Sequence, residues 1–168
     1  DNQPRFTHVT TVTHIRAYDP VVASGNFAYF TTRDGNEYFN SDRDTVSILD
    51  ISEIGNATVI FRYHQLDEPK GLALYQDSLF VCDQVAGLVK LNIQEVNLAD
   101  SDQLDAEGNL ITTETYGTGL VQEHLDDVYP CNDVIAIDNR LILTDKLRVT
   151  QLQITEQGLQ ELSVIEAN

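Results

Sequence analysis

The sequence has no tryptophan and no methionine, only two cysteines, and few basic side chains. No apolar run approaches the roughly 20 residues that a membrane-spanning helix needs, so the sequence predicts no such segment. There are 10 Lys and Arg against 27 Asp and Glu, and the formal net charge is −17. Phosphate binding requires clustered basic residues, so this balance argues against nucleic acid or an anionic membrane as a partner.

The start of the chain, DNQPRFTHV, is neither basic nor apolar and does not match a signal peptide. Because methionine is also absent, we expect a mature or trimmed chain that has lost a leader, a lipidated segment or flanking structural units. Hydrophobic residues make up 42% of the sequence, the usual share for a globular domain with a core of its own. Acidic residues are spread along the chain, which favours a solvated surface; cation binding and adaptation to salt are the alternatives.

The two cysteines, Cys82 and Cys131, lack the CxxC spacing of zinc, thioredoxin-like or c-type haem sites. We expect two buried free thiols. A disulfide in an oxidising compartment is the alternative, because the sequence cannot show whether the two Cα atoms lie within bonding reach.

Short β-rich runs separated by turn residues recur along the chain. In residues 67–93 the runs are GLALY, SLFVCD and LVKLNI, separated by QDS and QVAG. Residues 18–66 and 126–168 repeat this order, and the first turn of the last unit is expected at Asn139-Arg140. For the middle unit we expect LITTETYG (110–117) as the fourth strand. The following GLVQEHLDDVYP (119–130) is expected to be a short helix or irregular.

Matching positions recur in the three units. In the second runs Tyr29, Phe80 and Ile142 match, and they lie 51 and 62 residues apart. In the third runs Ile51, Ile93 and Ile154 match, 42 and 61 residues apart. A repeat of about 40–50 residues that holds four antiparallel strands is typical of β-propeller blades.

The sequence therefore predicts an all-β fold, a β-propeller of four-stranded antiparallel blades. About three blades are present, at approximately 18–66, 67–125 and 126–168, and residues 1–17 are expected to be the outer strand of a preceding blade. Because propellers close with about four to eight blades, we expect a partial propeller that belongs to a larger ring or packs against copies of itself or another chain.

Four segments carry a family resemblance: DPVVASGNFAYFTTRDG, TVSILDIS, EPKGLALYQDSLFVCDQVAGLVKLNI and NDVIAIDNRLILTD. On these segments the chain resembles bacterial LVIVD-repeat proteins, which are predicted surface or secreted β-propellers that often carry a lipoprotein-type signal. The resemblance implies an extracellular or cell-surface location and no particular reaction. The sequence departs from the family at Lys70, where many members have a histidine before Gly-Leu, and in the loop Arg33–Asp44, where members often have a cysteine.

Four histidines occur, His8, His14, His64 and His124, and we interpret them as ordinary strand or loop residues. His8 and His14 would lie on one side of a strand but roughly 20 Å apart, too far to share a metal.

Two acidic loops are the better candidates for a cation, because they place oxygen ligands at alternate positions. They contain Asp34, Asn36, Asn40, Asp42 and Asp44 in the first loop, and Asp100, Asp102, Asp105, Gly108 and Asn109 in the second (Gln94–Asn109). EF-hand spacing fails, because Asp105 and Ile111 stand where the loop needs a glycine and a bidentate glutamate. Solvated turn acids are the simpler interpretation, so calcium is an alternative and no metal ligand is assigned.

Motifs for covalent or phosphate chemistry are missing: there is no GxSxG elbow, and Gly117-x-Gly119 has no βαβ context, so a turn is expected there. Tyr38 and Phe39 stand in a polar loop, either as exposed anchors for a partner or folded back on their own blade. We assign no catalytic or cofactor-binding residue. The sequence favours a non-enzymatic extracellular or cell-surface protein-interaction or structural module. The alternatives are an enzyme or enzyme subunit whose axial active site is partly supplied by further sequence, and a calcium-stabilised surface protein.

Overall fold

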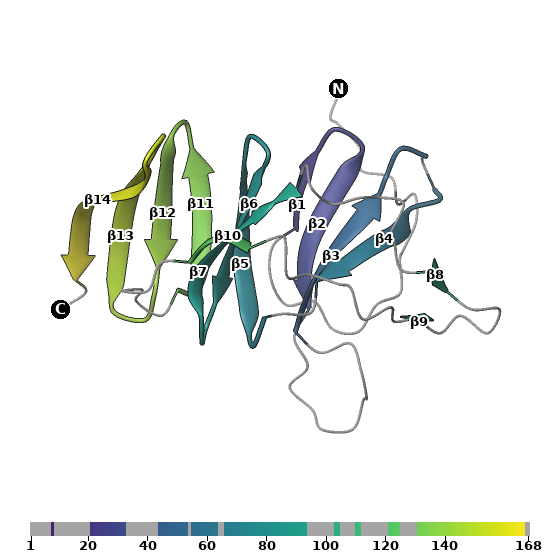
Figure 1. Cartoon of the computed structure of the whole chain (residues 1–168), viewed down its shortest axis with the longest axis horizontal. Helices are drawn as coiled ribbons and strands as arrows, with labels where there is room; N and C mark the ends of the chain where they lie inside the picture. Colours follow the sequence, from purple (N-terminus) through teal and green to yellow (C-terminus); the bar gives the residue numbers. More distant parts are fainter. Residues whose placement is uncertain are drawn as a thin grey trace, which may run out of the picture.

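The computed structural model describes His8, residues 21–32, 44–53, 55–63, 66–93 and 131–166, and the backbone of three short strands between 103 and 124. Within these residues the chain is all β, as predicted, with three four-stranded antiparallel sheets and one two-stranded sheet. The three four-stranded sheets stand side by side in chain order (Figure 1).

Each four-stranded sheet is a meander in which neighbouring strands pair antiparallel. The first sheet contains β1 (Val21–Ser24), β2 (Phe27–Thr32), β3 (Thr45–Asp50) and β4 (Thr58–Tyr63). The middle sheet has β5 (Pro69–Tyr75), β6 (Ser78–Asp83), β7 (Gly87–Asn92) and β10 (Val121–His124). The third has β11 (Asp133–Ile137), β12 (Arg140–Thr144), β13 (Arg148–Thr155) and β14 (Gly158–Glu166).

The same two-residue turn joins the first two strands of every four-stranded sheet. Its first residue has a left-handed backbone each time, with φ of 58° at Gly25, 51° at Gln76 and 54° at Asp138. Such turns match the twist of paired strands, and glycine and aspartate tolerate the conformation. The predicted turn at Asn139-Arg140 is therefore wrong by one residue, since Arg140 already pairs with Ile137.

A backbone hydrogen bond repeats at the second residue of this turn. Its carbonyl accepts from the N–H of an isoleucine near the end of the third strand: Ile51 to Asn26 at 2.8 Å, Ile93 to Asp77 at 2.9 Å, and Ile154 to Asn139 at 2.8 Å. Ile51 and Ile93 directly follow their strands, and Ile154 is the second-to-last residue of β13. The predicted equivalence of these three isoleucines is therefore confirmed by identical backbone contacts, although the sequence spacing between them is unequal.

The fourth strand of the middle sheet differs from the prediction. Val121 pairs with Leu91, so β10 arises from the segment that was expected to be helical or irregular. The LITTETYG segment does not supply this strand, because its β9 (Leu110–Ile111) pairs with β8 (Gln103–Leu104) in the two-stranded sheet. Each doubling of loop length raises the entropic cost of closing the loop by only about 0.6 kcal/mol. A later segment can therefore compete with residues 110–117 for the edge of β7.

Two hydrophobic interfaces hold the three sheets together, because strand side chains alternate between the two faces. We call the contact between the first and middle sheets the first interface; its buried residues are Tyr29, Val46, Ile48, Phe61, Tyr63, Leu66, Leu72, Leu79, Val81, Val89 and Leu91. The contact between the middle and third sheets is the second interface, built from Ala73, Phe80, Cys82, Leu88, Cys131, Val134, Leu141, Leu143 and Leu152.

The predicted blade boundaries stay a prediction. Apart from His8, the expected leading strand at 1–17 lies outside the described residues. In the described part of the chain, no helix has the length and apolar character that a bilayer crossing requires.

Candidate functional site

The inner strands β5 and β11 approach each other closely at Gly71. Its N–H donates to the Asn132 carbonyl at 3.0 Å, a backbone hydrogen bond between two sheets. A Cβ atom at Gly71 would lie 2.0 Å from Asp133 Oδ1 and 2.5 Å from Asp133 Cα. Only glycine fits this contact without movement of the neighbouring backbone.

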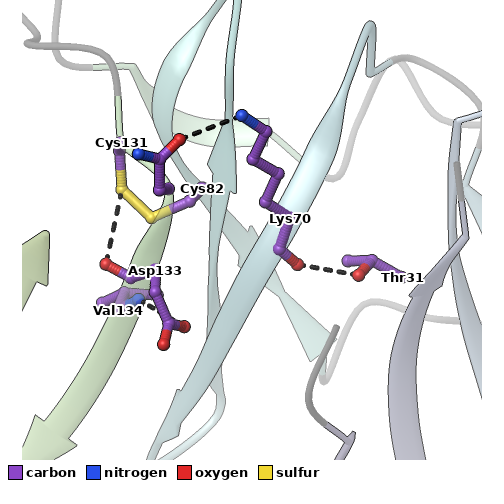
Figure 2. Close-up of a disulfide and its surroundings, with 7 residues drawn as sticks. Thr31, Lys70, Cys82, Cys131, Asp133 and Val134 are labelled. Carbon is purple, nitrogen blue, oxygen red and sulfur yellow. Dashed lines mark hydrogen bonds between the residues drawn. A yellow bond between two sulfur atoms is a disulfide. The ribbon is translucent and has the colours of Figure 1, made fainter. Parts of the chain in front are cut away.

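A disulfide crosses the second interface beside this contact (Figure 2). It joins Cys82 of β6 to Cys131, which precedes β11; the Cα atoms are 5.0 Å apart and both residues are buried. The prediction of two free thiols is therefore wrong. The cysteines are 49 residues apart in sequence, and they meet because face-to-face packing of the middle and third sheets brings β6 against the start of β11.

Asp83 organises the turn at the end of β6. Its fully buried carboxylate accepts the N–H groups of Val85 and Ala86 on Oδ1, and those of Asp67 and Glu68 on Oδ2. Four backbone donors can hold a buried carboxylate without a cation. Asp83 thus fixes both the β6–β7 turn and the segment that enters β5.

Asp145 plays the same part after β12. Its Oδ1 accepts from the N–H groups of Leu147 at 2.6 Å and Arg148 at 2.8 Å, and its Oδ2 accepts from Arg148 Nε at 3.2 Å. Desolvation acts to raise the pKa of Asp145, but these backbone donors and the Arg148 charge outweigh it and hold the pKa below its usual value. The carboxylate is therefore fully engaged by its own turn.

Lys70 lies between these two turns with only 9% of its surface exposed. Its Nζ donates to Asn132 Oδ1 at 2.9 Å and to Gln84 Oε1. Its backbone carbonyl accepts from Thr31 Oγ1 at 2.7 Å, so one residue connects all three sheets (Figure 2). Both Nζ acceptors are neutral amide oxygens, and among the described residues no carboxylate forms an ion pair with Lys70.

A pocket of about 290 Å³ opens beside the two amide groups. Its wall consists of Gln84, Asn132, Asp145, Lys146, Leu147 and Arg148. The pocket therefore lies at the strand ends, between the β6–β7 and β12–β13 turns.

The second candidate surface is the side of the third sheet that points away from the middle sheet, here called the outer face. By strand alternation its apolar residues are Ile135, Ile137, Ile142, Val149 and Ile165. Ile135 is 49%, Ile137 51% and Ile165 65% exposed. Large exposed aliphatic side chains on one sheet face indicate a surface for association.

The candidates from the sequence are only partly described. His8 is exposed, and Asp44 has a left-handed backbone with φ of 49°. His124 ends β10, whose side chains are not described. The other candidates lie outside the described residues: His14, His64, Asp34, Asn36, Tyr38, Phe39, Asn40, Asp42, Asp100, Asp102, Asp105, Gly108, Asn109, Gly117 and Gly119. Within the described residues, no group of three or more His, Cys, Asp or Glu is arranged to hold a metal.

Sequence reasoning missed the role of Lys70, which it noted only as a departure from a family pattern. A lysine within an otherwise apolar strand was the available signal. Its two acceptors could not be found, because Gln84 and Asn132 lie 14 and 62 residues away in sequence.

Comparisons with known proteins give a structural likeness and no family. No protein-family model matches the chain, and no curated protein is significantly similar in sequence. A chain in the crystal structure of a nidogen/laminin complex is similar over 84% of this chain, with a TM-score of 0.47 and 16% identity. The match covers 43% of that chain. The fold described above therefore rests on the sheet topology of this chain itself.

Proposed function

We propose that this chain is a non-enzymatic, extracellular protein-interaction module built from propeller blades, and that its outer face binds a second copy of the chain. The observation that carries this proposal is that equivalent positions of the three sheets are buried to different extents. Tyr29, Phe80 and Ile142 are each the third residue of the second strand of their sheet. Tyr29 and Phe80 are buried against the following sheet, whereas Ile142 lies on the outer face and is only half-buried.

Charge supports a second copy as the occupant. Two chains of net charge −17 repel each other, so they associate best where acidic groups are absent. By alternation, Glu161 and Glu166 of β14 fall on the side of Leu152 and Arg148, away from the outer face. Asp133 belongs to the outer side by position, but its carboxylate accepts from the Val134 N–H and lies against Gly71.

The opposite end of the molecule supports a symmetric pairing. Ala28, Phe30 and Leu49 belong to the side of the first sheet that faces away from the middle sheet, and all three are buried. A head-to-tail contact would need this side to be open. When two outer faces pack against each other about a two-fold axis, the same apolar surface is buried in both copies.

The disulfide supports the extracellular part of the proposal, since such bonds persist in secreted and surface proteins and are rare in the cytosol. Membership of the LVIVD-repeat family is proposed on the sequence resemblance alone. Calcium binding by the acidic loops stays a prediction, because their candidate oxygen ligands, apart from Asp44, lie outside the described residues.

Light scattering coupled to size exclusion tests the pairing. The wild-type chain should have twice the mass of one chain and dissociate on dilution. Ile135→Asp should weaken association by about tenfold or more, because a carboxylate in an apolar interface is desolvated without a partner. Ile165→Asp, on the same face in β14, should act in the same direction.

Val85→Asp is the matched control. Val85 is equally apolar and 69% exposed, but it lies in the β6–β7 turn and not on the outer face. This variant should associate like the wild type. A wild-type chain that is monomeric at high micromolar concentration, or an equal effect of Val85→Asp and Ile135→Asp, would contradict the proposal.

A further inference from the structure

Lys70 is only 9% exposed, and its ammonium forms no ion pair with a carboxylate of the described residues. It has three N–H groups, and the side-chain oxygens of Gln84 and Asn132 accept two of them. Amide oxygens satisfy donors but do not neutralise a positive charge, and a buried charge is costly unless it is paired. The Lys70 charge therefore favours an anion in front of these two amide groups.

The neighbouring pocket has the matching charge. Gln84 and Asn132, the two acceptors of Lys70, also form part of the pocket wall, so the ammonium lies one hydrogen bond behind that wall. Lys146 and Arg148 line the same pocket. With Lys70 they provide three cations against the single carboxylate of Asp145, an excess of two positive charges in a chain of net charge −17.

The Asp145 carboxylate does not neutralise the two excess positive charges. Its Oδ1 is engaged by the backbone N–H groups of Leu147 and Arg148, and its Oδ2 by Arg148 Nε. Lys146 is exposed, and neither a hydrogen bond nor an ion pair joins its ammonium to another described residue. Lys146 can thus contact a ligand in the pocket directly, whereas Lys70 acts on it from behind the wall, through the Gln84 and Asn132 side chains.

We propose that this pocket is a binding site for a carboxylate anion, held by Lys146 and by the side-chain N–H₂ groups of Gln84 and Asn132, whose oxygens accept from Lys70. An amide N–H₂ can donate to one carboxylate oxygen while its oxygen accepts from Lys70. A volume of about 290 Å³ admits a small organic acid or one acidic side chain of a peptide. The site lies at the strand ends, so it is separate from the outer face and independent of the proposed association.

The site is tested by calorimetric titration of the intact, oxidised chain with four probes. Succinate represents a free organic acid, and acetyl-glutamate amide represents an acidic side chain of a peptide. Succinamide is the uncharged counterpart of succinate, and inorganic phosphate is the competing anion. Succinate or acetyl-glutamate amide should bind saturably, with weaker binding as salt is raised, and succinamide should not bind. Tighter binding of succinate assigns a free organic acid, and tighter binding of acetyl-glutamate amide assigns an acidic side chain.

Substitutions locate the site. Lys70→Met should weaken carboxylate binding by about tenfold or more, because it removes the positive charge behind the wall and the hydrogen bonds that hold the amides of Gln84 and Asn132 with their N–H₂ groups free to donate. Lys146→Gln changes an exposed side chain and should weaken binding by about threefold while the fold is unaffected. Lys90→Met is the matched control, since Lys90 also belongs to the middle sheet but does not line the pocket, and it should bind like the wild type.

Three results would overturn the proposal: no saturable binding of either carboxylate, equal binding of succinate and succinamide, or tighter binding of phosphate than of both carboxylates. Should Lys70→Met fail to fold, as judged by circular dichroism, Lys146→Gln decides the question. Undiminished binding in that variant refutes the site.

Discussion

The first and second interfaces join similar sheets by different physical means. At the first interface the first sheet contributes three aromatic residues, Tyr29, Phe61 and Tyr63, which pack against leucine and valine of the middle sheet. At the second interface the middle sheet contributes the small side chains of Ala73 and Cys82 beside the larger Phe80 and Leu88. Large side chains keep two sheets apart and bury more apolar area, whereas small ones let the backbones approach.

The polar connections differ in the same way. A side-chain hydrogen bond from Thr31 Oγ1 to the Lys70 carbonyl crosses the first interface. The second interface has the backbone hydrogen bond from Gly71 to Asn132, the Lys70–Asn132 contact and the disulfide. We infer that the first interface depends mainly on apolar burial and the second on backbone proximity and a covalent bond. The two should therefore respond to different perturbations.

The largest effect is expected from removal of the disulfide by Cys82→Ala with Cys131→Ala. The bond closes a loop of 49 residues, for which the chain-entropy model gives about 4 kcal/mol of stability. Urea unfolding followed by circular dichroism should show a loss of this order. Reductant should destabilise the wild type by a similar amount and leave the double variant unchanged. A loss below about 1 kcal/mol would show that proximity alone holds the second interface.

The repeat was predictable from sequence because it depends on local signals. Turn residues and alternating apolar runs located the strands of the first and third sheets, and the matched isoleucines Ile51, Ile93 and Ile154 make the same backbone contact. The fourth strand of the middle sheet was not predictable. Either Leu110–Ile111 or Val121–His124 satisfies strand propensity, and only tertiary pairing selects between them.

The next effect in size is expected for Gly71→Ala. The added methyl group would overlap Asp133, including its Cα, so β5 and β11 must separate and the Gly71–Asn132 hydrogen bond lengthens. Overpacking of this kind typically costs about 1–3 kcal/mol. Hydrogen exchange should show faster exchange of the residue 71 amide, and urea unfolding should show the loss of stability.

Gly25→Ala is the matched control, because a Cβ at Gly25 meets no atom within 4 Å although its φ is 58°. It should cost only the backbone strain of a left-handed residue, about 1 kcal/mol. Equal losses for the two variants would mean that the approach of β5 to β11 adds nothing to stability.

The candidate site was less accessible to sequence reasoning than the fold. Lys70, Gln84 and Asn132 come from three separate segments, and no spacing rule connects them. The disulfide raised the same difficulty, since its two cysteines carry no motif and meet only through the packing of two sheets. Local patterns predict strands, whereas contacts between sheets depend on the relative placement of whole sheets.

The smallest effect at neutral pH is expected for Tyr63→Phe, which tests the first interface through its pH dependence. Burial raises the pKa of Tyr63 to about 12, whereas in the unfolded chain it should lie near the ordinary value of about 10. Folding thus favours the neutral phenol. The resulting stability is complete below about pH 10 and is lost as the pH rises from about 10 to about 12. The wild type should therefore lose more stability than Tyr63→Phe between pH 9 and pH 11, measured by urea unfolding at fixed ionic strength.

Burial also raises the pKa of Tyr29. Tyr63→Phe should therefore keep part of the pH dependence of stability, and a Tyr29→Phe, Tyr63→Phe double variant should keep less. Parallel pH profiles for all three proteins would show that the aromatic residues of the first interface ionise without opposing the fold, and the contrast with the second interface would then not extend to pH.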